Sequence, residues 1–340
     1  MRQPTKILLI YTGGTIGMAH DERGTLVPFD FHNQMDSFLM TDLNVEVTVK
    51  SFDEPIDSSD VGPADWRNIG EVIKADYANF DSFIILHGTD TMAYSASALS
   101  FMLDGLNKPV IFTGSQLPIG AARSDARENL MTSLEIAGDR SQGNPRVAEV
   151  CLYFSGMLLR GNRARKVQSI HFDAFQSENY PPLAEAGVTI DYDDSAIGPC
   201  EPAATLKYRD QFDTRVSILK LFPGIRREVV ECVLNTPGIR GVVLETYGSG
   251  NAPTHKWFLE ALRKANDRGV LLFNVSQCTG GRVIQGHYQS SYYLEEMGVL
   301  SGADITTEAA ITKMMFLLGE LDDTEEVKKA LVTPIRGEMS

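Results

Sequence analysis

The sequence predicts an α/β fold with a larger N-terminal domain on a parallel sheet and a smaller C-terminal α/β domain. Three observations lead to this prediction. The chain has 340 residues, 43% of them hydrophobic, which is more than one ordinary core holds. Short apolar runs alternate with segments of helical periodicity, as in right-handed βαβ units. A stretch rich in proline, glycine and aspartate interrupts the alternation.

The first half of the chain supplies four expected strands and three expected helices. The helix expected at residues 63–77 illustrates the reasoning, because Trp66, Ile69 and Ile73 fall on one face at helical spacing. The other two helices are expected at 91–103 and 125–137. The strands are short apolar runs at 6–11, 82–86, 110–112 and 147–154. We therefore expect an N-terminal domain at 1–190.

The alternation breaks at residues 181–213, where six prolines and glycines lie among several aspartates, beginning with Pro181 and Pro182. We interpret 191–213 as an interdomain linker. Alternation then resumes, with strands expected at 216–221, 241–246 and 270–275 and helices at 224–234, 255–265 and 306–318. These elements predict a smaller C-terminal domain at 214–340.

Charge and cysteine content exclude several classes of function. A net charge of −14 argues against nucleic acid as a partner, because phosphate binding needs a basic surface. The four cysteines have no metal-ligand spacing and are typical of reduced thiols in the cytoplasm. The apolar stretch at 7–11 is too short for a signal peptide or a membrane span. We expect a cytoplasmic protein with no membrane or nucleic-acid partner and no metal.

Three expected strands each end in a loop of hydroxylated residues and glycines. The loops are Thr-Gly-Gly-Thr at 12–15, His-Gly-Thr-Asp-Thr at 87–91 and Thr-Gly-Ser-Gln at 113–116. Ligands of open parallel sheets bind outside the carboxyl ends of the strands, so these loops predict one crevice. Any one loop alone is also explained by turn geometry and helix capping. A phosphate site is disfavoured, because neither GxxxxGK[ST] nor GxGxxG is present.

A threonine hydroxyl becomes a nucleophile only when a neighbouring base takes its proton. Two bases are open. His87 ends a strand, although a lone histidine there is more often structural. Lys166 lies in a basic stretch at 160–166, where neighbouring positive charges are expected to depress its pKa. From spacing alone, a solvated basic turn is the favoured explanation of that stretch.

The segments 11–18 and 85–92 closely resemble the two signatures of the asparaginase/glutaminase family, TGGTI and HGTDT. Further similarity runs through 57–60, 113–116, 161–166, 247–253, 277–278 and 302–304, so it covers nearly the whole chain. Details such as Ala-Tyr after the second signature are similar to the cytosolic type I branch. The resemblance implies an enzyme that hydrolyses L-asparagine to L-aspartate and ammonia through an acyl-threonine, without a cofactor.

The resemblance also implies catalytic roles. Thr15 is the expected nucleophile. Thr89, Asp90 and Lys166 are expected to form a hydroxyl–lysine–carboxylate relay, with the backbone N–H of Thr89 as oxyanion donor.

Substrate-binding roles follow from the same resemblance. Asp57, Ser58 and Ser59, together with Asp90, are expected to hold the α-carboxylate and α-ammonium groups of the substrate. Asn251 matches a residue that relatives contribute from a neighbouring subunit, which implies a homodimer or homotetramer.

Two positions depart from the family pattern. Thr25 stands where many members carry a tyrosine, and Tyr288 is the best candidate for a phenol that assists Thr15. Glu245 stands where allosteric type I enzymes carry an arginine, and a carboxylate does not bind the carboxylate of an effector.

Two other functions remain possible from the sequence. One is the amidohydrolase subunit of a tRNA-dependent amidotransferase, which shares both signatures and usually has an extra N-terminal domain. The other is an amino-acid sensor that binds without turnover. The ratio of asparagine to glutamine hydrolysis is open, since one methylene discriminates by only ~1–3 kcal/mol.

Overall fold

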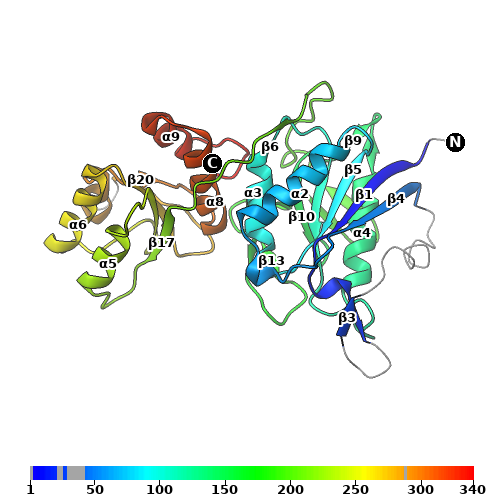
Figure 1. Cartoon of the computed structure of the whole chain (residues 1–340), viewed down its shortest axis with the longest axis horizontal. Coiled ribbons are helices and arrows are strands. Elements are labelled where there is room, and N and C mark those ends of the chain that lie inside the picture. The colour runs from blue at the N-terminus through cyan, green and yellow to red at the C-terminus, as the bar shows by residue number, and fades with distance from the viewer. Residues whose placement is uncertain (1–2, 21–25, 29–42, 287–288) are drawn as a thin grey trace. The chain divides into compact units, whose positions relative to one another are not determined.

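The computed structural model describes residues 3–20, 26–28, 43–286 and 289–340. The chain divides into two units, Met1–Arg209 and Asp210–Ser340 (Figure 1). Each unit has its own sheet, flanked by helices. The predicted α/β class, with a larger parallel-dominant sheet followed by a smaller parallel one, is confirmed.

The first unit is organised around an eight-stranded sheet in the order β15-β14-β11-β10-β7-β5-β1-β4. The strands β4, β1, β5, β7 and β10 run parallel to one another, and β11, β14 and β15 continue the sheet in antiparallel fashion. Their bounds are β1 (Thr5–Tyr11), β4 (Val45–Ser51), β5 (Ser82–Leu86), β7 (Val110–Thr113), β10 (Val150–Phe154), β11 (Met157–Arg160), β14 (Ala184–Ala186) and β15 (Ile190–Tyr192).

Helices cover both faces of this sheet (Figure 1). The helix α4 (Ala126–Gly138) packs on β1, β5, β7 and β10, and its Leu130 and Leu134 join Ile7 and Leu9 in one apolar cluster. The helix α3 (Met92–Met102) packs on β7 and β10 and against α2 (Pro63–Asp76). Because neighbouring residues of a strand point to opposite faces, burial on both faces explains why β1 and β5 are continuous apolar runs.

Short elements complete the first unit. Part of the predicted linker 191–213 lies within this unit, since β15 and β16 pair with β14 and β6 respectively. The remaining short elements are η1 (Thr15–Gly17), β2 (Met18–His20), β3 (Leu26–Pro28), η2 (Ser58–Asp60), β6 (Leu103–Asp104), β8 (Arg140–Ser141), β9 (Asn144–Pro145), β12 (Arg165–Lys166), β13 (Phe175–Gln176) and β16 (Lys207–Tyr208).

The second unit is a four-stranded parallel sheet in the order β17-β18-β19-β20. Its strands are β17 (Val216–Lys220), β18 (Gly241–Thr246), β19 (Leu271–Ser276) and β20 (Leu300–Ser301). The helices are α5 (Arg227–Leu234), α6 (Lys256–Asp267), α7 (Gln289–Glu296), α8 (Thr307–Glu320) and α9 (Thr324–Leu331). Across the described residues of both units, no helix has the length and apolar character needed to cross a membrane.

Candidate active site

The three strand-end loops meet at the carboxyl edge of the first sheet, as their spacing predicts. The backbone N–H and the hydroxyl of Thr12 both donate to the carbonyl of Leu86, each at 3.0 Å, which ties the end of β1 to the end of β5. The N–H of His87 donates to the carbonyl of Thr113 at 3.0 Å and ties β5 to β7. The loops are therefore fixed to one another by the sheet itself.

Glycines allow the loops to touch backbone to backbone. Gly14 has φ +89°, and a Cβ on it would lie 2.6 Å from the Cα of Gly88. A Cβ on Gly88 would lie 2.5 Å from the hydroxyl of Ser58. Side chains at these positions would push the loops apart, so glycine is required for the close approach. Thr15 directly follows Gly14, and Thr89 directly follows Gly88. Both threonines therefore start from the junction where these two glycines meet, with Ser58 beside it.

Lys166 reaches this junction from the short hairpin of β12 and β13. Its Nζ donates to Thr89 Oγ1 at 2.7 Å and to Asp90 Oδ1 at 2.7 Å. The lysine side chain is 17% exposed and that of Asp90 is 67% exposed, so the cluster lies at the border of protein and solvent. A hydroxyl, an amine and a carboxylate thus form one connected path along which protons can move.

The predicted substrate-binding residues at 57–59 lie beside the same junction. Asp57 Oδ1 accepts hydrogen bonds from the backbone N–H of Ser59 at 2.9 Å and from its hydroxyl at 2.6 Å, and thereby caps η2. These bonds hold the pKa of Asp57 below its usual value, so the carboxylate is ionised at neutral pH. The hydroxyl of Thr91 donates to the carbonyl of Ser58 at 2.6 Å and connects this segment to the loop of Thr89 and Asp90.

His87 occupies a different environment from that of Lys166. Its side chain is fully buried; Nδ1 lies 2.7 Å from the carbonyl of Gly88 and Nε2 lies 2.9 Å from Ser95 Oγ. Trp66 donates to the same Ser95 hydroxyl at 3.0 Å. Burial lowers the pKa of His87 to about 4, so the ring is neutral at physiological pH. Both ring nitrogens are engaged away from the threonines, which favours the structural interpretation of this histidine.

Gln116 is a residue of the site to which sequence reasoning gave no role. Its Oε1 lies 3.4 Å from Thr89 Oγ1, and its Nε2 donates to the carbonyl of His171 at 3.0 Å. The carboxylate of Asp125, at the start of α4, accepts from the backbone N–H of Gln116 and fixes the loop after β7. The motif at 113–116 contains this glutamine, but nothing in the sequence indicates that the carboxylate of Asp125 accepts from its backbone N–H.

The remaining predicted residues belong to the second unit or lie outside the described residues. Asn251 belongs to the second unit, where it forms a bridge with Tyr247 through N–H···O bonds of 2.8 and 2.9 Å. Tyr288 and Thr25 lie outside the described residues, so the phenol proposed to assist Thr15 has no structural description.

Glu245 is engaged within the second unit. The side chain is 7% exposed. Its Oε1 accepts from the hydroxyl of Thr307 at 2.6 Å, and its Oε2 lies 3.3 Å from Lys220 Nζ. The carboxylate therefore anchors the start of α8 to the end of β18.

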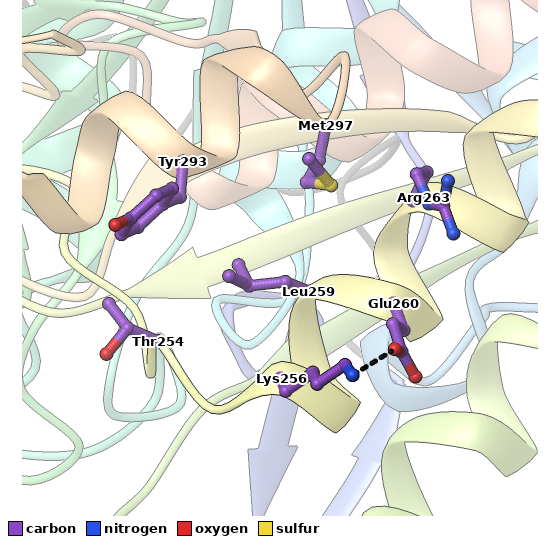
Figure 2. A pocket seen from close by; sticks show the side chains of 7 residues that line it. All are labelled: Thr254, Lys256, Leu259, Glu260, Arg263, Tyr293 and Met297. Carbon is purple, nitrogen blue, oxygen red and sulfur yellow. Dashed lines mark ion pairs between the residues drawn. The ribbon is translucent and has the colours of Figure 1, made fainter.

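A pocket of about 720 Å³ lies on the second unit between α6 and α7 (Figure 2). Lys256 and Glu260 of α6 form an ion pair on its rim at 3.9 Å. None of the predicted site residues that the structure describes lines this pocket. The lining residues are Thr254, Lys256, Leu259, Glu260, Arg263, Tyr293 and Met297.

A hydroxyl–lysine–carboxylate cluster at the carboxyl ends of a parallel sheet can carry the proton transfers of an amidohydrolase. Comparison with known families makes this specific. Residues 6–197 match the family described as "Asparaginase, N-terminal", and residues 215–331 match the one described as "Glutaminase/Asparaginase C-terminal domain". The chain belongs to the asparaginase family, and the resemblance predicted from its signatures is confirmed.

Individual relatives agree with this assignment. L-asparaginase 1 of Escherichia coli (strain K12) is 42% identical over 342 aligned residues that cover 99% of each chain. The crystal structure of L-asparaginase I from Vibrio cholerae superposes with a TM-score of 0.89 at 39% identity and covers 99% of each chain. A Glutamyl-tRNA(Gln) amidotransferase subunit of Metallosphaera sedula is 32% identical over 98% of this chain and 77% of its own length.

Proposed function

We propose that the protein hydrolyses the side-chain amide of L-asparagine to L-aspartate and ammonia, with Thr15 as the nucleophile. The observation that carries this proposal is the pair of 2.7 Å contacts from Lys166 Nζ to Thr89 Oγ1 and Asp90 Oδ1. They lie next to the glycine junction from which Thr15 also leaves. Two threonines and a lysine at one loop junction supply a nucleophile and a proton carrier for a two-step acyl transfer.

In the first step the Thr15 hydroxyl oxygen attacks the amide carbon of the substrate and loses its proton. The backbone N–H of Thr89 donates to the developing oxyanion. The C–N bond then breaks, and the nitrogen takes up the proton and leaves as ammonia. The product of this step is an aspartyl ester on Thr15.

In the second step water cleaves the ester. Thr89, Lys166 and Asp90 accept and pass on the proton of the attacking water, and the proton returns to the oxygen of Thr15 as aspartate leaves. The 2.7 Å N–O contacts support this role, because proton transfer needs heavy atoms within about 2.6–3.2 Å.

The α-amino and α-carboxylate groups of asparagine need partners of opposite character. We assign Asp57 and Asp90 to the ammonium group and Ser58 and Ser59 to the carboxylate, which requires the Ser59 N–H and hydroxyl to exchange their bonds to Asp57 Oδ1 for bonds to the substrate. The lowered pKa of Asp57 supports the assignment, since an ionised carboxylate attracts an ammonium group.

We further propose that the active unit is a homodimer or homotetramer in the cytoplasm, in which Asn251 completes the site of a neighbouring subunit. The free thiols of all four cysteines support a reducing compartment. Light scattering of the active protein tests assembly. A fully active monomer would contradict it, as would Asn251→Ala with unchanged KM and kcat.

Ammonia release from free L-asparagine, in the absence of tRNA, tests the function itself. An L-asparaginase releases ammonia under these conditions, whereas the amidohydrolase part of a tRNA-dependent amidotransferase or a sensor does not. The amidotransferase remains the second candidate because the Metallosphaera sedula relative is similar over 98% of this chain. Parallel assays with L-glutamine measure how far the crevice discriminates the extra methylene.

A further inference from the structure

A buried asparagine interrupts the apolar strand β19 in the second unit. Leu272, Phe273 and Val275 are fully buried and apolar, as expected for a strand covered on both faces. Asn274 stands among them and is also fully buried. Asparagine is depleted from strands, and its amide is costly to bury unless every polar atom is paired. This position therefore calls for a reason other than core packing.

The amide of Asn274 is paired on both sides. Its Oδ1 accepts from the hydroxyl of Thr246 at 2.6 Å, and its Nδ2 donates to the carbonyl of Gly250 at 3.3 Å. Thr246 is fully buried at the end of β18 and fixes which way the amide faces. A Cβ on Gly250, which has φ +102°, would lie 3.1 Å from Asn274 Nδ2, so the turn packs directly on the amide.

Gly250 belongs to the turn at 247–251 that ends in Asn251. Three consecutive carbonyls of this turn accept from two other segments. Two residues of β19 donate, Ser276 Oγ to Gly248 at 2.6 Å and Asn274 Nδ2 to Gly250, and the N–H of Ile284 donates to Ser249 at 2.9 Å. The two backbone bonds between Tyr247 and Asn251 close the turn. Hydrogen bonds to successive carbonyls restrict the conformational freedom of this surface turn. Such restriction is needed if the turn is to hold Asn251 in one orientation.

We propose that Asn274, oriented by Thr246 and assisted by Ser276, is a positioning residue that fixes the turn presenting Asn251 to the substrate site. This inference rests on the proposed role of Asn251. Asn274 itself touches no substrate; it acts through the Gly250 carbonyl and the turn. A purely structural role predicts lost stability, whereas a positioning role predicts lost substrate use that depends on Asn251.

A double-mutant cycle separates the two roles. Asn274→Leu and Ser276→Ala each remove one bond to the turn, and each is measured alone and combined with Asn251→Ala. Ammonia release from L-asparagine by the assembled enzyme gives kcat and KM. We expect each single change to lower kcat/KM about tenfold, mainly through KM. Combined with Asn251→Ala, neither change lowers kcat/KM further, because the residue it positions is already gone.

Two further variants serve as controls. Thr312→Val removes another fully buried hydroxyl of the second unit, one that donates to the carbonyl of Glu308 at 2.8 Å, and retains wild-type kinetics. Ser276→Thr keeps the hydroxyl and recovers at least half of the lost kcat/KM. If Asn274→Leu does not fold, Ser276→Ala carries the test, because its side chain is only half-buried.

The outcomes distinguish the inference from the function on which it rests. Wild-type kcat/KM in Asn251→Ala would overturn the proposed role of Asn251 and this inference with it. A loss in Asn251→Ala, together with double variants whose losses equal the product of the single losses, would overturn the inference alone. Wild-type kinetics in Ser276→Ala and Asn274→Leu would do the same.

Discussion

Replacing His87 by glutamine tests the physical reason for assigning this residue a structural role. The ring is fully buried, and desolvation lowers its pKa from 6.5 to about 4. The hydrogen bond to Gly88 and the charge of Asp65 oppose this shift but are weaker causes. A glutamine keeps a polar side chain that does not titrate, so the variant removes the proton-binding group and spares much of the space.

The sign of the effect follows from which state binds the proton. Below pH 6.5 the unfolded chain protonates His87, while the folded protein keeps the ring neutral until the pH nears 4. The contribution of the neutral His87 ring to the free energy of unfolding is therefore fully present above pH 6.5 and decreases as the pH drops toward 4. The separation of the two pKa values corresponds to about 3 kcal/mol in total, and to about 2 kcal/mol between pH 7 and pH 5.

Urea unfolding at pH 7 and pH 5 measures this difference. Wild type is expected to exceed His87→Gln in stability by about 1–3 kcal/mol at pH 7. That advantage shrinks by about 2 kcal/mol at pH 5. The exposed His255→Gln serves as the control and shows no such change. An equal stability difference at both pH values would refute the structural assignment. So would a loss of activity of about 10²–10⁴-fold in His87→Gln, the effect expected for a general base.

Three other predictions concern charged groups. Lys166→Met lowers kcat by about 10²–10⁴-fold but changes the free energy of unfolding by less than about 1 kcal/mol, since its partner Asp90 is largely exposed. Lys50→Met removes another partly exposed ion pair and serves as the control. Equal activities in the two variants would refute the relay. The rate is expected to rise hyperbolically with asparagine concentration, because Glu245 is buried, accepts from Thr307 and does not bind a carboxylate effector. Sigmoidal kinetics that a substitution at Glu245 abolishes would contradict this. Lys313→Met leaves the fully buried carboxylate of Glu338 without its lysine counter-ion, although backbone N–H groups still donate to it, and lowers the unfolding free energy by about 3–5 kcal/mol. Urea titration measures this loss, and a change below about 1 kcal/mol would show the pair to be dispensable.

The parallel part of the fold and its loops were predictable from the sequence. Continuous apolar runs such as Ser82–Leu86 require burial on both faces, and parallel topology brings the ends of β1, β5 and β7 to one edge. The antiparallel extension was not predicted. Its strands β14 and β15 have three residues each and lie in or next to a proline-rich segment, so neither length nor periodicity marks them as strands.

Prediction of the candidate site from the sequence is limited for a similar reason. The strand-end motifs indicate Thr15 and Thr89, because polar residues directly follow apolar runs. The position of Lys166 beside Thr89 depends on a hairpin of two-residue strands, which periodicity does not predict. The basic stretch at 160–166 made this lysine a candidate, and the resemblance gave it a role. Asn274 shows the same limit in the second unit, since one polar residue in an apolar strand has no meaning until its partners are known.

The turnover of Thr15→Ala bears most directly on the proposed threonine mechanism. We expect this variant to fold and melt like wild type but to release ammonia from L-asparagine roughly 10⁴-fold more slowly or worse, because the attacking oxygen is gone. Thr15→Ser keeps a hydroxyl and retains measurable turnover well above that of the alanine variant. Turnover by Thr15→Ala within tenfold of wild type, in protein free of host enzyme, would contradict Thr15 as the nucleophile.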